Sequence, residues 1–146
     1  MPIQTAYADT IAVSYPGEVA DLGLSDVISR DIETAGGVPF GVAVIQGTAD
    51  RQAKLGTAGV FIGITVRDQT LVGDTHPDKY LVQETAGVMT RGVIWVLAGE
   101  AVVAGDVVYR TATGTLNKTA ASNTLIAGAR WETSAASGAL ARLRLV

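Results

Sequence analysis

Apolar residues in the second half of the chain fall into short runs, and turn residues separate these runs at an even spacing. In the run over residues 93–98, Val93, Trp95 and Leu97 alternate with Ile94, Val96 and Ala98. Turn signals follow one another every ~8–12 residues, which is typical of an all-β sandwich or barrel. The pattern therefore predicts an all-β fold, a small β-barrel or β-sandwich. We expect strands over residues 93–98, 107–111 and 125–131, with turns at 104–106, 113–114 and 137–138.

The last run predicts a strand with one buried and one solvated face. Ala141, Leu143 and Leu145 point one way, and Arg142 and Arg144 point the other. We expect this strand to lie at an edge of the sheet, where the two arginines would discourage pairing with another chain.

The first half of the chain is less regular. Residues 26–34 favour a strand over a helix because β-branched residues are frequent there. The glycines at 36–37 end it. Residues 60–66 form a near-continuous apolar run, which predicts a strand buried on both faces. We further expect strands at 39–46 and 80–83, loops at 48–57 and 67–77, and a turn at 86–87.

The N-terminal residues are polar, aromatic and irregular, up to a turn signal at Pro16-Gly17. We expect residues 1–17 to form an extended arm and residues 18–146 to form a single β domain. Residues 1–33 hold six acidic residues against one arginine, a net charge of −5, whereas the whole chain carries −3. This segment is either a solvated edge or an arm that docks on a basic partner surface.

Composition narrows the function further. The chain has 146 residues, which suits one domain, and no cysteine, which excludes disulfides and thiolate metal sites. Only 17% of residues are charged. The small negative net charge gives no general attraction to nucleic acid, and no apolar run approaches the ~18 residues of a membrane span. We expect neither nucleic acid nor a membrane as a partner.

The search for reactive residues finds little. His76, the only histidine, lies between Asp74 and Asp78 in a segment expected to be a loop, and no G-x-S-x-G sequence accompanies it. We therefore predict no catalytic residue, no metal site and no cofactor. Trp95 and Trp131 leave open a second hypothesis, a carbohydrate-binding β module that uses an indole as a stacking platform.

The order of several short motifs resembles the bacteriophage structural cement, or head decoration, proteins. Upstream, the similarity rests on Tyr15-Pro16-Gly17 followed by Ala20-Asp21, and on the strand over residues 61–67. Downstream it rests on residues 92–96 (Gly-Val-Ile-Trp-Val), 104–109 (Ala-Gly-Asp-Val-Val-Tyr), 113–116 (Thr-Gly-Thr-Leu), 128–134 (Gly-Ala-Arg-Trp-Glu-Thr-Ser) and 138–141 (Gly-Ala-Leu-Ala). Each motif is simple, so their order and spacing carry the resemblance.

The resemblance implies a protein without catalysis, made in the host cytoplasm and located on the outer capsid surface of the virion. Its expected partners are the major capsid protein and further copies of itself in a homo-oligomer, a trimer in preference to a dimer. The expected contacts to the capsid or within the oligomer lie in the acidic N-terminal segment, at Tyr7, Asp9, Tyr15, Pro16, Glu18 and Asp21.

Overall fold

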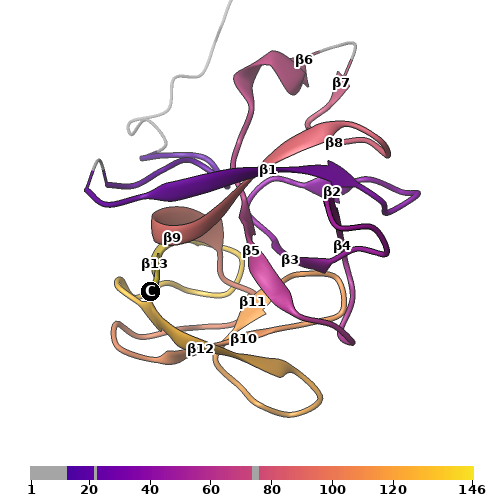
Figure 1. Ribbon diagram of the computed structural model, residues 1–146. Helices are drawn as coiled ribbons and strands as arrows, with labels where there is room; N and C mark the ends of the chain where they lie inside the picture. The colour runs from indigo at the N-terminus through magenta and orange to yellow at the C-terminus, as the bar shows by residue number, and fades with distance from the viewer. Residues whose placement is uncertain (1–12, 22, 74–75) are drawn as a thin grey trace, which may run out of the picture.

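The computed structural model describes residues 13–21, 23–73 and 76–146. These residues form one large sheet of nine strands that curls into two small barrels, with two additional two-stranded pairs. The predicted all-β class is confirmed, and the architecture is that of a barrel rather than a sandwich. No helix in the described ranges is long and apolar enough to cross a bilayer. Figure 1 shows the strands over residues 26–54 in the upper part of the molecule and those over residues 107–131 in the lower part.

The first barrel is closed by hydrogen bonding around a ring of five strands. Each strand pairs with the next, and the last pairs back with the first, since β9 bonds both β5 and β1. One pairing, between β1 and β4, is parallel. In ring order the strands are β1 (Asp26–Ile32), β4 (Gln52–Lys54), β3 (Ala43–Gln46), β5 (Phe61–Thr65) and β9 (Thr85–Leu97).

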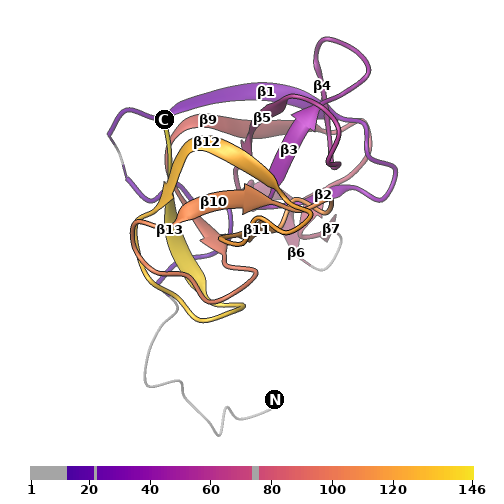
Figure 2. The ribbon, with the colours of Figure 1, turned by 90° about the horizontal axis from the view of Figure 1, so that it is seen from below.

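The second barrel uses the C-terminal half of β9 as its first strand. Gly92 has a positive φ of 130° at the point where β9 leaves the first barrel and starts to pair with the last strand. A bridge between Ala98 and Leu116 closes this second ring. Figure 2 shows its later strands gathered on one side of the molecule. They are β10 (Val107–Arg110), β11 (Leu116–Asn117), β12 (Thr124–Trp131) and β13 (Leu140–Leu145).

Two apolar cores fill the barrels, and β3, β5 and β9 form the wall between them. Val44 and Val88 face the first core, whereas their chain neighbours Ala43 and Met89 face the second. A wall of this kind is apolar on both faces, which explains the continuous apolar run that predicted β5. Burying one such large side chain contributes roughly 1.5–3 kcal/mol.

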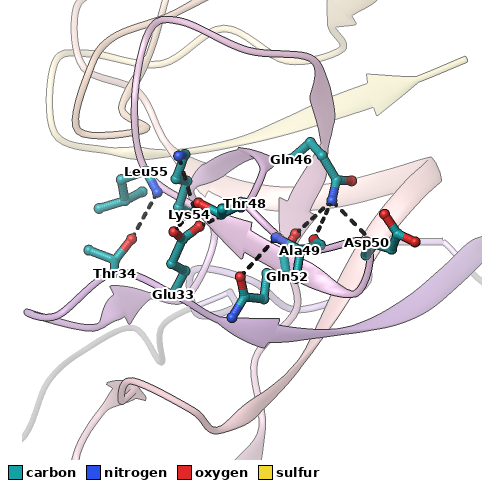
Figure 3. Close-up of polar contacts among 9 residues, drawn as sticks. All are labelled: Glu33, Thr34, Gln46, Thr48, Ala49, Asp50, Gln52, Lys54 and Leu55. Carbon is teal, nitrogen blue, oxygen red and sulfur yellow. Dashed lines mark hydrogen bonds and ion pairs between the residues drawn. The ribbon is translucent and has the colours of Figure 1, made fainter.

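The polar stretch 48–57 was predicted to be a loop, but it contains the strand β4, so this prediction is corrected. Polar side chains fold it into a hairpin with β3 (Figure 3). Thr48 donates to Glu33 through its hydroxyl at 2.5 Å and its N–H at 2.8 Å, and Lys54 lies 3.9 Å away. These hydrogen bonds, and the nearby ammonium, hold the pKa of Glu33 below its ordinary value despite partial desolvation. Sequence periodicity missed β4 because only Ala53 in it is buried.

Three other element predictions are corrected. The strand expected over 39–46 is split by a turn at Phe40–Gly41 into β2 (Val38–Pro39) and β3. The strand expected over 80–83 ends at Tyr80. The turn expected at 86–87 lies inside the 13-residue strand β9. The loop expected over 67–77 holds only short elements, η1 (Gln69–Leu71), β6 (Val72–Gly73) and β7 (His76–Pro77), while β8 (Lys79–Tyr80) pairs with β2.

The last strand is not an edge, in contrast to the prediction. β13 lies between β9 and β12 and pairs with both. Its predicted faces are confirmed, because Ala141, Leu143 and Leu145 are buried in the second core. The arginines have a different role from the expected one. Arg142 and Arg144 both contact Glu132, the residue directly after the neighbouring strand β12.

Candidate functional site

Residues 13–24 form a ridge along the outside of the second barrel, here called the N-terminal ridge (residue 22 is not described). Its backbone runs antiparallel to β9. Gly17 donates to the carbonyl of Trp95 at 2.8 Å, Trp95 donates back to Glu18 at 2.9 Å, and Ala20 donates to Val93 at 2.8 Å. The ridge therefore covers the side of β9 that faces away from β13. The part of the predicted arm that is described, residues 13–17, lies against the body here, and the division of the chain at residue 17 stays a prediction.

The ridge begins with a tight turn whose residues match its geometry. Tyr15 accepts from the N–H of Glu18 at 3.2 Å, and Gly17 has φ +87°. Proline followed by glycine at the centre of a turn is the signature of type II. A side chain at position 17 would bring Cβ within 2.8 Å of the N atom of Arg67. Glycine is therefore required there both by the backbone angle and by close packing.

Glu18 braces this turn. Its carboxylate accepts from the hydroxyl of Ser14 at 2.6 Å, from the N–H of Tyr15 at 3.3 Å and from the side chain of Gln69 at 3.2 Å. Glu18 was predicted to contact a partner, but its carboxylate forms hydrogen bonds within its own molecule and stabilises the turn.

Asp21 remains available at the surface. Its side chain is 52% exposed; one carboxylate oxygen accepts from the N–H of Gly23 at 2.9 Å, and the other lies 3.8 Å from Arg142. Such exposed ion pairs contribute ~0–1 kcal/mol, so Asp21 can exchange Arg142 for another cation at little cost. It belongs to a charged group around Arg142 on β13, in which Glu132 also contacts Arg142 at 3.4 Å.

The ridge presents large apolar side chains to solvent. Val13 is 82% exposed, Tyr15 52%, Val19 39% and Leu24 79%. Four such side chains are exposed within twelve residues. Large apolar patches on a surface commonly mark sites of contact with a partner. This exposed apolar set, rather than the acidic charge alone, is the chemistry that the ridge offers to a partner.

A groove opens beside the turn, and we call it the Arg67 groove. Its volume is about 510 Å³, and its wall is mostly apolar. The Arg67 guanidinium lies 4.8 Å from the ring centre of Tyr15 and 5.4 Å from that of Phe40. The lining residues come from the turn, from the end of β2 and the residues after it, from the end of β9, and from short segments after β5 and before β8, β11 and β13. They are Pro16, Pro39, Phe40, Gly41, Val42, Arg67, Asp78, Leu97, Ala98, Gly99, Thr115, Ser137 and Gly138.

The remaining predicted positions are placed as follows. Tyr7 and Asp9 lie outside the described residues, whereas Pro16 lies at the rim of the Arg67 groove. Trp131 is 1% exposed in the second core, so it cannot serve as a sugar platform. Trp95 is half-buried on β9 beside the ridge. Among the described residues no three His, Asp or Glu side chains are grouped as for a metal ion.

Sequence reasoning missed Arg67, Phe40 and Leu97 as members of one surface. They come from three segments that are far apart in the chain, so no local spacing connects them. The available signal was the position of Leu97 in its strand. Ile94, Val96 and Ala98 fill the core, so Leu97 lies on the opposite face.

Comparison with known proteins adds information on relationship. The family model described as structural cement protein (E217 gp24/Pam3 gp6) matches residues 3–146. A search of curated proteins finds no match.

Among solved structures, a chain from "The capsid of Myoviridae Phage XM1" is similar with a TM-score of 0.78 and 18% identity, over 99% of this chain and 98% of that one. The head fiber gp8.5 N base of bacteriophage phi29 is more distant. Its TM-score is 0.48 at 15% identity, over 84% of this chain and 95% of that one.

Proposed function

Because this chain belongs to the phage structural cement protein family, we propose that it binds the outer surface of an icosahedral shell and bridges neighbouring subunits of the major capsid protein, without catalysis. The capsid cement role itself follows from the family, whose model covers the chain from residue 3 to its last residue. That match is the observation that carries the proposal. The phage XM1 capsid structure supports it, since one of its chains has the same fold.

The surface that we assign to the shell is the N-terminal ridge. Its exposed apolar side chains, Val13, Tyr15, Val19 and Leu24, supply area for burial against a partner. Its backbone is held by hydrogen bonds to β9, so binding orders few groups that were free before. Asp21 adds a carboxylate for a basic residue of the shell. Glu18 supports the ridge from behind and is not itself assigned to the shell.

A closed β body suits this role because it resists deformation. Both rings of strands are closed, so the two barrels expose no long strand edge that could pair with another chain. We further propose a homo-oligomer, with a trimer preferred. Several ridges that act together raise the total affinity without a tight single contact.

The test uses shells of the parent phage assembled without this protein. Purified protein is mixed with the shells, and the bound fraction is measured by cosedimentation. The variant Val13→Ser with Leu24→Ser should bind at least tenfold more weakly, because it removes two exposed apolar contacts from the ridge. The matched control, Val60→Ser with Leu125→Ser, removes side chains that are 75% and 49% exposed elsewhere on the molecule, and it should bind like the wild type.

Equal binding of both double variants would contradict the assignment of the ridge. Absence of binding by the wild-type protein would contradict the proposed shell attachment as a whole.

A further inference from the structure

The Arg67 groove lies directly beside the point at which the described chain begins. Tyr15 contacts Arg67, Pro16 forms part of the rim, and Val13 is almost fully exposed. The described chain therefore begins three residues before the rim of a mostly apolar groove of about 510 Å³. A segment of few residues with one or two apolar side chains would fill such a space.

The groove also contains a cation with one unpaired donor atom. The Nε atom of Arg67 is buried and has no hydrogen-bond partner among the described residues. The contacts of its guanidinium are the faces of Tyr15 and Phe40. Asp78, the one acidic residue of the lining, already has an interaction partner. A carboxylate that entered the groove would form a charge-assisted hydrogen bond with Arg67.

Residues 1–12 have the matching chemistry. Their sequence is MPIQTAYADTIA, and it contains one acidic residue, Asp9. In an extended chain, alternate side chains share a face. Tyr7, Asp9 and Ile11 would then lie on one face as an apolar, acidic, apolar series. This series complements a groove with apolar walls and one arginine.

The geometry of the turn favours a second molecule as the partner. Within one chain, Tyr15 and Pro16 are fixed at the rim by the brace of Glu18 and the hydrogen bonds of Gly17. Only four residues separate residue 11 from Pro16 at the rim, so binding of residues 7–11 within the same molecule would require the chain to turn back within those four residues. Twelve extended residues span up to about 40 Å, which is enough to reach a neighbouring molecule.

We propose that residues 1–12 of one copy bind in the Arg67 groove of a second copy, with Asp9 paired with Arg67 and with Tyr7 and Ile11 on the apolar wall. The proposal deepens the self-association in the proposed function and rests on it. Segment and groove are different surfaces, so the contact is heterologous, and such contacts form a ring when the rotation between neighbouring copies closes. A ring agrees with a trimer.

The first experiment exploits the absence of cysteine from the chain. Two single variants are made, Thr10→Cys in the segment and Ser137→Cys in the groove lining. They are mixed and treated with a short bismaleimide. We expect a covalent dimer from the mixture. Thr10→Cys mixed with Ser122→Cys, an exposed site outside the groove lining, should give little. A link inside the double variant Thr10→Cys with Ser137→Cys, without a link in the mixture, would overturn the exchange.

The second experiment measures molar mass in solution by light scattering, without shells. The full chain should be an oligomer, and deletion of residues 1–12 should yield a monomer. Asp9→Arg and Arg67→Asp should each weaken the oligomer at least tenfold, and the combined charge swap should restore it. Recovery in the swap shows that Arg67→Asp did not simply unfold the protein.

A monomeric full chain, an oligomer that survives the deletion, or a swap that fails to restore assembly would each overturn the proposal. Because no shell is present, these outcomes leave the test of capsid attachment independent.

Discussion

Replacing Gly17 with alanine should detach the N-terminal ridge from the body, and its cost can be worked out from the structure. Two effects add. An L-residue at φ +87° costs roughly 1–2 kcal/mol. In addition, the new Cβ would lie 2.8 Å from the N atom of Arg67 and 3.0 Å from that of Gly41, both backbone atoms that cannot rotate away.

Relief of this clash displaces the turn and weakens two hydrogen bonds, Gly17 N–H to Trp95 and Arg67 N–H to Gly17. Each contributes about 1 kcal/mol. The expected loss in the free energy of unfolding is therefore about 3–4 kcal/mol.

Two other glycines provide matched controls. Gly138 has φ +79° and open space around it, so Gly138→Ala carries only the backbone cost of roughly 1–2 kcal/mol. Gly36 has open space and no positive φ, so Gly36→Ala should change stability by less than about 0.5 kcal/mol. Urea unfolding of the three variants measures the differences. Limited proteolysis then tests whether cleavage between residues 13 and 24 becomes faster in Gly17→Ala alone.

The reasoning would be refuted by a Gly17→Ala variant that loses no more stability than Gly138→Ala and stays resistant between residues 13 and 24. The close contact with the Arg67 backbone would then not hold the ridge in place.

Three further predictions concern the body. Arg110 is 2% exposed and donates to the carbonyls of Gly56, Thr57 and Gly59, so Arg110→Met should cost about 2–4 kcal/mol in urea unfolding, and an unchanged midpoint would contradict this role. Gly63→Ala would place its Cβ against the carbonyl of Met89 on β9, so we expect loss of soluble folded protein on expression, whereas Gly36→Ala expresses normally. Hydrogen bonds from Thr48 lower the pKa of Glu33, so the ionised Glu33 stabilises the fold fully above the ordinary pKa of about 4.3, and this stabilisation is lost as the pH falls through the lowered pKa. Glu33→Gln should therefore flatten the dependence of the free energy of unfolding on pH below about pH 5. An unaltered dependence would contradict this role of Glu33.

Much of the fold could be predicted from the sequence where one face of a strand is buried. β13 alternates cleanly, because one side fills the core of the second barrel and the other carries arginines, whereas the second half of β9 was predicted from its apolar run. β5 was predicted from its continuous apolar run, which reflects its place in the wall between two cores. These signals are local and need no knowledge of the partner strand.

The errors arise where pairing over long distances decides the structure. β4 has one buried residue and owes its place to hydrogen bonds with β3 and β1. The glycine at 87 is typical of a turn, yet β1 and β5 flank it and hold it within β9. β13 was expected at an edge because nothing in the sequence shows that the chain returns to place it between β9 and β12.

The same limit applies to the candidate site. The turn at Pro16-Gly17 and the exposed Tyr15 were predictable from residue types. The Arg67 groove was not, because its walls come from seven separate stretches of chain. Glu18 was expected to face a partner on the basis of its charge, but it is used to brace the turn.

The most direct test of the central claim is the temperature at which undecorated shells of the parent phage open, measured with and without saturating protein. A cement that bridges neighbouring shell subunits must raise this temperature, and the Val13→Ser, Leu24→Ser variant must raise it less at the same protein concentration. Shells that bind the protein and still open at an unchanged temperature would contradict a cementing role.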